Sequence, residues 1–171
     1  LFKPIINQIT SQRPNIVFHT GNLVGENENV ENWRTNFFSP MQDLLNSVPL
    51  LPVMGDSEKN SLSIKRYFPF FQKTTYWSYD YGMVRFIGLD SHLNGDLKSE
   101  QLRWLNEQLA NHEQKWTIII LHHPITIENT KDSMGWDWLP LFQQHHVDLV
   151  IGGHDPTYSR SYPIGMFHEG H

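Results

Sequence analysis

The stretch Thr117-Ile118-Ile119-Ile120-Leu121-His122-His123-Pro124 decides the fold, because an unbroken apolar run stops abruptly at two histidines. Three further stretches share this design, each a short apolar run that ends in a loop marked by glycine or histidine. They cover residues 16–22, 50–58 and 148–156. In open α/β sheets the ends of such strands gather at one edge and build the active site. The sequence therefore predicts one site assembled from four loops that lie far apart along the chain.

Length and composition predict one α/β domain over residues 1–171, with a sizeable core and many aromatic side chains. The formal net charge of −5 argues against nucleic acid or an anionic membrane as a partner. Cysteine is absent, which excludes disulfides, thiolate metal sites and a cysteine nucleophile. No apolar run approaches the roughly 20 residues of a membrane span.

The order of apolar patterns predicts strands that alternate with helices. Strands are expected at 15–19, 50–54, 116–121 and 147–151. Helices are expected at 1–12, at 30–47 with a break at Pro40, near 60–66, from Ser99 onward and at 134–146. Residues 76–90 indicate a β-hairpin that turns near Tyr81 and Gly82. This order implies a mostly parallel sheet covered by helices, with the hairpin as an antiparallel component or a second sheet.

Two of the helices carry apolar stripes that predict their buried faces. Ile5, Ile6 and Ile9 are expected on the inner face of the first helix. Leu102, Leu105 and Leu109 are expected on the inner face of the helix that Ser99 would cap at its N-terminus.

The four loops resemble the motifs of the calcineurin-like metallophosphoesterases, and within them the purple acid phosphatase branch. The family motifs Gly-Asp, Gly-Asn-His-Glu, His-x-Pro and Gly-His-x-His correspond in order to Gly21-Asn22, Gly55-Asp56-Ser57-Glu58, His122-His123-Pro124 and Gly153-His154-Asp155-Pro156. The resemblance extends over residues 15–164. It implies an α/β/β/α sandwich of mixed sheets flanked by helices. Because the family's opening Asp-x-His motif would precede Leu1, it also implies an internal segment of a longer domain, without the first strand and the last strands.

The departures from these motifs are concentrated on one of the family's two metal ions. Asn22 replaces the bridging aspartate, Gly25 the tyrosine ligand and Pro156 the last histidine, so the first ion loses every visible ligand. The second ion's four positions still carry groups able to coordinate. The resemblance thus implies one zinc, manganese or iron ion rather than two. Its ligands would be Asp56, His122 and His154, with Asn22 as an optional fourth.

The activity that this resemblance implies is metal-dependent hydrolysis of phosphoric esters, as in acid phosphatases. His122 and His154 would serve catalysis as well as metal binding. Ser57 stands where the family has a histidine that faces the substrate, and such a group contributes about 10²–10⁴-fold to rate, so we expect low activity. The alternatives are a catalytically dead pseudo-phosphatase that acts as a binding or scaffold module, and a partial or altered sequence of an ordinary enzyme.

The resemblance further implies a phosphorylated small molecule or other phosphoester as substrate, and a secreted or periplasmic location. The sequence carries no signal for a particular oligomeric state.

The candidate ligands also have purely structural interpretations. Asp56 follows a glycine and could hydrogen-bond within its own turn. His122 and His154 could be satisfied by backbone groups. Their occurrence together at corresponding strand ends favours metal binding.

Three neighbouring residues have other expected roles. His123 is expected to be structural or to support a ligand. Glu58 is expected either to orient the loop that carries Asp56 or to be solvated, and the first interpretation is favoured. The sequence indicates no partner for His92.

Overall fold

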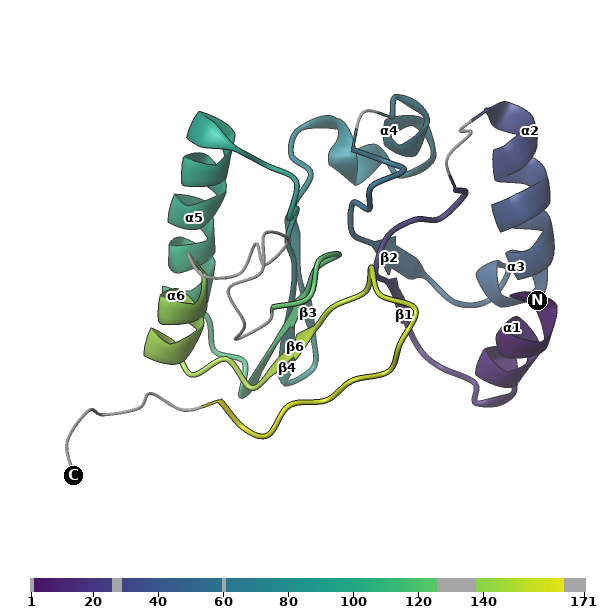
Figure 1. Cartoon of the computed structure of the whole chain (residues 1–171). Coiled ribbons are helices and arrows are strands. Elements are labelled where there is room, and N and C mark those ends of the chain that lie inside the picture. The colour runs from purple at the N-terminus through teal and green to yellow at the C-terminus, as the bar shows by residue number, and fades with distance from the viewer. Residues whose placement is uncertain (1, 26–28, 60, 126–137, 165–171) are drawn as a thin grey trace.

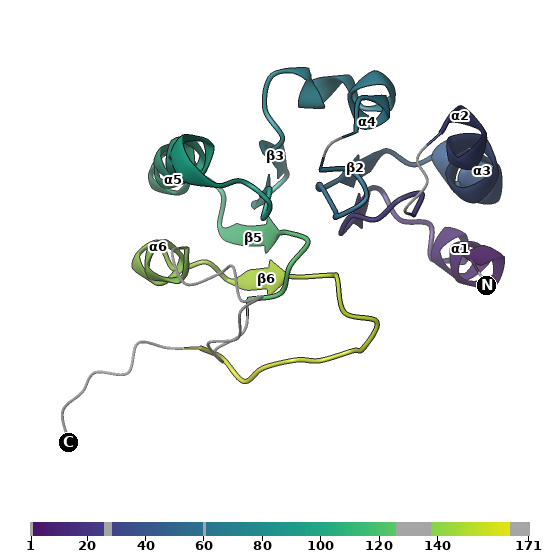
Figure 2. The ribbon, with the colours of Figure 1, turned by 45° about the horizontal axis from the view of Figure 1, so that its top comes forward.

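The computed structural model describes residues 2–25, 29–59, 61–125 and 138–164. Two β-sheets lie between two groups of helices, so the predicted α/β/β/α architecture with mixed sheets is confirmed (Figure 1). In the rotated view, one group of helices lies outside the small sheet and the other outside the larger sheet (Figure 2).

The small sheet pairs β1 (Val17–His19) with β2 (Leu50–Pro52) in parallel. The larger sheet has the order β3-β4-β5-β6. Its first two strands, β3 (Trp77–Tyr81) and β4 (Val84–Gly88), form the predicted antiparallel hairpin. The remaining strands, β5 (Trp116–Ile120) and β6 (Leu149–Ile151), continue from β4 in parallel. The carboxyl ends of β4, β5 and β6 therefore meet at one edge.

The alternation of side chains along β5 creates the layers. Successive residues of a strand point to opposite faces of its sheet. Ile118 and Ile120 pack into the core between the two sheets, where they join aromatic side chains such as Trp77. Ile119 and Leu121 pack into a second core on the opposite face. The unbroken apolar run of this stretch thus reflects a strand that is covered on both faces.

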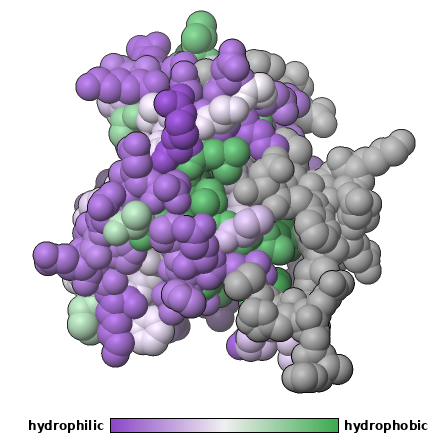
Figure 3. Space-filling model, turned by 90° about the vertical axis from the view of Figure 1, so that its left-hand side faces the viewer, coloured by the Kyte–Doolittle hydropathy of each residue, from purple (hydrophilic) through white to green (hydrophobic). Residues whose placement is uncertain are grey.

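The second core is closed by α5 (Gly95–Ala110) and α6 (Leu139–Gln144). Leu105 and Leu109 are buried and Leu102 is partly buried, as predicted. The predicted cap is wrong: the helix begins at Gly95, and Asn94 occupies the N-cap position with extended backbone. Ser99 lies inside the helix, where its hydroxyl donates to the carbonyl of Gly95 at 3.2 Å. On this side, hydrophilic side chains cover much of the surface and apolar atoms show between them (Figure 3).

The other group of helices covers the small sheet. It consists of α1 (Phe2–Ser11), α2 (Val30–Asn32), a π-helical segment (Trp33–Phe38) and α3 (Ser39–Leu45). Ile6 and Ile9 pack inward as predicted, but Ile5 is 57% exposed, because consecutive helical residues point about 100° apart. The shorter elements α4 (Ser63–Tyr67) and a 3₁₀ turn (Pro69–Gln72) lead to the hairpin.

The predicted break at Pro40 is also wrong. Both Phe38 and Ser39 keep right-handed helical dihedrals, so the segment remains helical from Val30 to Leu45. Pro40 is the second residue of α3 and follows directly on the π-helical segment. The preceding π-helical turns, in which the N–H of Ser39 donates to the carbonyl of Arg34, accommodate the ring. Of the predicted helix at 134–146, residues 139–144 are helical and 134–137 lie outside the described residues.

Glu58 joins the loops that follow β1 and β2. Its side chain is fully buried. One carboxylate oxygen accepts the backbone N–H groups of Asn22 at 2.8 Å and Gly55 at 3.1 Å, and the other accepts that of Leu23 at 2.8 Å. The predicted orienting role of Glu58 is therefore confirmed, and it extends to both loops.

Glycine is required where these two loops cross. A Cβ on Gly55 would lie 2.2 Å from the backbone nitrogen of Asn22, and one on Gly21 would lie 2.6 Å from the Cα of Gly55. Both distances are far below van der Waals contact. The two glycines let the backbones approach closely enough for one carboxylate to bind both loops.

We expect Glu58→Gln to destabilise the protein by about 1–3 kcal/mol, because an amide nitrogen would face buried N–H donors and leave them unsatisfied. Urea unfolding measures the change. Glu113→Gln is the matched control, since Glu113 is exposed on the surface. Equal stability of the two variants would contradict the role assigned to Glu58.

Candidate metal centre

The site lies where strand ends of both sheets converge. Asn22 follows β1, Asp56 follows β2, His122 follows β5 and His154 follows β6, as the sequence predicted. The loop after β4 adds His92. Backbone hydrogen bonds extend the sheet pairing into these loops, including Gly153 N–H to the carbonyl of His122 at 2.8 Å. The candidate ligands are therefore presented by the facing edges of two sheets.

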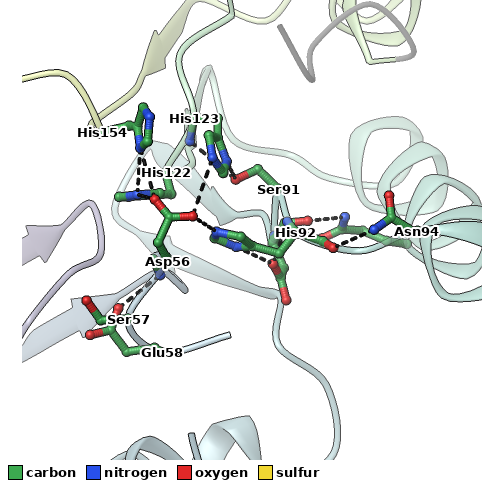
Figure 4. A network of polar contacts seen from close by, with 12 residues as sticks. Asp56, Ser57, Glu58, Ser91, His92, Asn94, His122, His123 and His154 are labelled. Atoms are coloured by element: carbon green, nitrogen blue, oxygen red, sulfur yellow. Dashed lines mark hydrogen bonds and ion pairs between the residues drawn. The ribbon is translucent and has the colours of Figure 1, made fainter. Parts of the chain in front are cut away.

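The carboxylate of Asp56 is the centre of this cluster (Figure 4). Its Oδ2 lies 3.0 Å from Nδ1 of His154 and 3.2 Å from Nε2 of His122. Its Oδ1 lies 3.1 Å from Nε2 of His92 and 3.7 Å from Nε2 of His123. Nδ1 of His154 and Nε2 of His122 are 3.4 Å apart. One carboxylate thus faces four imidazoles.

The hydrogen bonds of His122 define its tautomer. Its Nδ1 lies 2.6 Å from the carbonyl oxygen of Thr20, which can only accept. Nδ1 therefore carries a proton, and Nε2 is the nitrogen that faces Asp56 and can bind a metal ion when it is unprotonated. Metal-binding histidines have this arrangement, in which the second nitrogen donates to a protein oxygen. The ring is 1% exposed, so the donor is fixed in place.

His154 reaches the cluster from a less protected position. Its side chain is 38% exposed, at the rim of the site. Its backbone has a φ of 65°, a left-handed conformation that is uncommon for residues other than glycine. Such conformations cost about 1–3 kcal/mol and concentrate at functional sites. The strained loop places Nδ1 of His154 beside Asp56.

Asn22 is placed near the cluster, but its oxygen is directed elsewhere. The amide oxygen accepts the backbone N–H of Ser57 at 3.0 Å and the Ser57 hydroxyl at 3.1 Å. The amide nitrogen lies 3.4 Å from Nε2 of His122. A carbonyl oxygen with two such partners has no lone pair left for a metal ion. Ser57, predicted to be catalytic, thus contacts Asn22 and holds its amide.

The polar surroundings shift two pKa values strongly. Partial burial raises the pKa of Asp56, but hydrogen bonds from His92 and His122 and the charges of nearby imidazoles outweigh burial and bring it to about 2. Burial, followed by the charges of His92 and His122, lowers the pKa of His123 to about 4. At neutral pH, Asp56 is therefore ionised and His123 is uncharged, which are the states that bind cations.

His92 and His123 complete the cluster. His123 fits its predicted supporting role, since its Nδ1 lies 2.7 Å from the hydroxyl of Ser91. His92 was missed, although one signal was present in the sequence. The apolar run that ends at Gly88-Leu89 leads directly into Asp90-Ser91-His92. The sequence pattern was interpreted as a hairpin, which made no use of the carboxyl end of β4. That end lies at the same edge as the end of β5, because the two strands are parallel.

The donor set suits a divalent metal ion. Ligand atoms of Asp56, His92, His122 and His123 all lie within 4.8 Å of one another. One carboxylate with imidazole nitrogens is a ligand set for zinc, and also for iron or manganese.

Among the described residues, no helix has the length and apolar character to cross a membrane.

In metal-free protein, Asp56→Asn should lower stability at neutral pH and lose this effect in acid. A carboxyl whose pKa falls from 3.8 to about 2 on folding stabilises the folded state above pH 3.8, and this contribution is lost as pH falls toward 2. Urea unfolding of both proteins between pH 6 and about 2.5 measures the difference. Asp43→Asn, at an exposed position of α3, is the control. A difference that grows on acidification would contradict this electrostatic account.

Comparison with known proteins assigns the family. The model of the calcineurin-like phosphoesterase family matches residues 2–158. An uncharacterised protein of Mycobacterium tuberculosis is 36% identical over 110 residues, which cover 52% of this chain and 21% of that protein. An Arabidopsis thaliana protein named "Probable inactive purple acid phosphatase 24" is 27% identical over 182 residues, which cover 87% of this chain and 29% of that protein. This chain thus spans less than a third of the length of these relatives.

A solved structure shows the same fold. Purple acid phosphatase from yellow lupin seeds superposes with a TM-score of 0.71 at 22% identity, over 90% of this chain and 32% of that one. This structural agreement and the family match over residues 2–158 point to the same family. The chain belongs to the calcineurin-like phosphoesterase family, and purple acid phosphatases are among its relatives.

Proposed function

We propose that this chain is a metal-dependent phosphoric-ester hydrolase whose reduced centre holds one ion. The observation that carries the proposal is the carboxylate of Asp56, with Nε2 of His122 and Nδ1 of His154 at 3.2 and 3.0 Å. These three side chains come from the ends of three separate strands. Convergence of one carboxylate and two imidazoles from such distant positions is typical of a ligand set.

Asp56, His122 and His154 would hold the ion. When bound, a divalent ion supplies positive charge that polarises a phosphoryl oxygen and activates water. The geometry of Asn22 does not support the optional role considered for it, because Ser57 occupies its amide oxygen. The position where the family has a bridging carboxylate thus carries a neutral amide that is already engaged. This supports one ion rather than two.

The chain's own groups define what they can do with a phosphoester. His154 lies at the exposed rim, where an incoming substrate would meet it first. The imidazole of His123, with a pKa lowered to about 4 chiefly by burial, is uncharged at neutral pH and can accept a hydrogen bond or a proton. Ser57 is half-buried and its hydroxyl donates to Asn22, so it does not supply the stronger acid that histidine would provide. We therefore expect phosphomonoesters or diesters of small molecules to turn over slowly.

A pseudo-phosphatase remains the competing proposal, and one specific observation favours it. The Arabidopsis relative that matches 87% of this chain carries the word inactive in its name. In this chain the first ion's visible ligand positions are lost, at Asn22, Gly25 and Pro156. Under this alternative the preserved cluster would bind a ligand or stabilise the fold without turnover.

Hydrolysis of p-nitrophenyl phosphate and bis(p-nitrophenyl) phosphate tests the proposal. Metal-free protein is loaded with Zn²⁺, Mn²⁺ or Fe²⁺ in turn and compared with metal alone. We expect slow, metal-dependent hydrolysis that falls by about 100-fold or more in His122→Ala, since loss of even an outer partner of a metal ligand costs 10–100-fold. His145→Ala, which removes a histidine that contacts Asn106 instead, should retain the activity.

Absence of hydrolysis by folded protein with metal bound would reject the proposal and favour the pseudo-phosphatase. Equal hydrolysis by wild type and His122→Ala would show that the reaction occurs elsewhere or arises from a contaminant.

A further inference from the structure

His92 repeats the arrangement seen at His122. Its Nδ1 lies 3.2 Å from Oδ1 of Asp90, and a carboxylate oxygen can only accept. Nδ1 therefore carries a proton, and Nε2 is directed at Asp56 Oδ1, 3.1 Å away. This nitrogen points to the centre of the cluster (Figure 4). In the metal-free protein it donates to Asp56, and a bound ion would take the place of that proton. A carboxylate behind a histidine whose other nitrogen faces a metal is a recurrent arrangement in metal sites.

The loop that carries His92 is rigidly supported. Asp90 is 3% exposed, and its carboxylate also accepts the backbone N–H of His92 at 2.9 Å. The fully buried side chain of Gln101, on α5, accepts the backbone N–H of Asp90 at 2.8 Å and donates to its carbonyl at 2.9 Å. A metal ligand needs this kind of support, because small displacements weaken coordination.

The distances between donor atoms fit a single ion. Ligand atoms about 2.0–2.2 Å from a tetrahedral zinc ion lie roughly 3.3–3.6 Å from one another. Nε2 of His122 and Nδ1 of His154 lie 3.2 and 3.0 Å from Asp56 Oδ2 and 3.4 Å from each other, whereas Nε2 of His92 lies 3.1 Å from Oδ1. Ligand atoms of Asp56, His92 and His122 also lie within 4.8 Å of one another. Both oxygens of one carboxylate therefore face the candidate imidazoles.

We infer that His92 is a protein ligand of the bound ion and takes the coordination position that Asn22 cannot fill. The inference rests on the proposed one-metal centre and extends it: the ion is held by Asp56, His92, His122 and His154. His123 is not included, since its Nδ1 contacts the Ser91 hydroxyl, which both donates and accepts and so does not fix a tautomer in which Nε2 is free. Asp90 acts as the positioning residue behind His92.

The binding of Zn²⁺ to metal-free protein, measured by competition with a chromophoric chelator, tests the inference. We expect His92→Ala to weaken Zn²⁺ binding by at least 10-fold, and Asp90→Asn by about 10–100-fold. His122→Ala should weaken it as well, whereas His145→Ala should not. The visible absorption of bound Co²⁺, which reports coordination number, should change in His92→Ala and remain unchanged in His145→Ala.

The outcomes separate this inference from the proposed function. Unchanged Zn²⁺ affinity and Co²⁺ absorption in His92→Ala, with binding lost in His122→Ala, would overturn the role of His92 and leave the one-metal centre intact. His92 would then only bridge two carboxylates. Unchanged affinity in both variants would overturn both. If His92→Ala fails to fold by circular dichroism, His92→Gln, which keeps a hydrogen-bonding side chain, undergoes the same measurements against the same criteria.

Discussion

The buried carboxylate of Glu58 is the constraint on which the site depends. It accepts backbone N–H groups from the loop after β1 and from the loop after β2, and so holds two chain segments 35 residues apart in one arrangement. The close crossing at Gly21 and Gly55 makes this possible, since neither position has room for a side chain. The backbone of Asp56 lies within this clamped loop, two residues before Glu58. The position of the central carboxylate therefore follows from a contact in which Glu58 binds only backbone N–H groups.

The exchange of asparagine and aspartate between positions 22 and 56 explains the rest of the site. In related enzymes the resemblance places the carboxylate at position 22, between two ions. Here the negative charge is at Asp56, facing four imidazoles, while the amide of Asn22 is satisfied by Ser57. The negative charge thus lies beside the histidines. This placement is consistent with the proposed centre of one ion.

Much of this arrangement could be predicted from the sequence, because strand ends of parallel sheets must converge. The run Ile118-Ile119-Ile120-Leu121 indicated a strand buried on both faces, and His122 at its end indicated the site. Where prediction failed, the cause was local. Pro40 indicates a break only if the preceding turn is α-helical, and here it is π-helical. Asn94 and Ser99 are both good capping residues, and the sequence alone does not decide between them. Ile5 is exposed because the rotation of the first helix about its axis turns Ile6 inward instead. Three apolar residues define that rotation poorly.

His92 was missed for a different reason. Its placement depends on Asp90, two residues away, and on Gln101, which binds the backbone of Asp90 from α5. Such partners become visible only when the side chains are placed in space.

The number of metal ions per chain tests the central claim most directly. Protein purified without chelators and without metal-charged resin is analysed for its elements, against a protein concentration from amino-acid analysis. A single centre around Asp56 predicts about one zinc, iron or manganese ion per chain. Two ions per chain, or none in folded protein supplied with metal, would contradict the account.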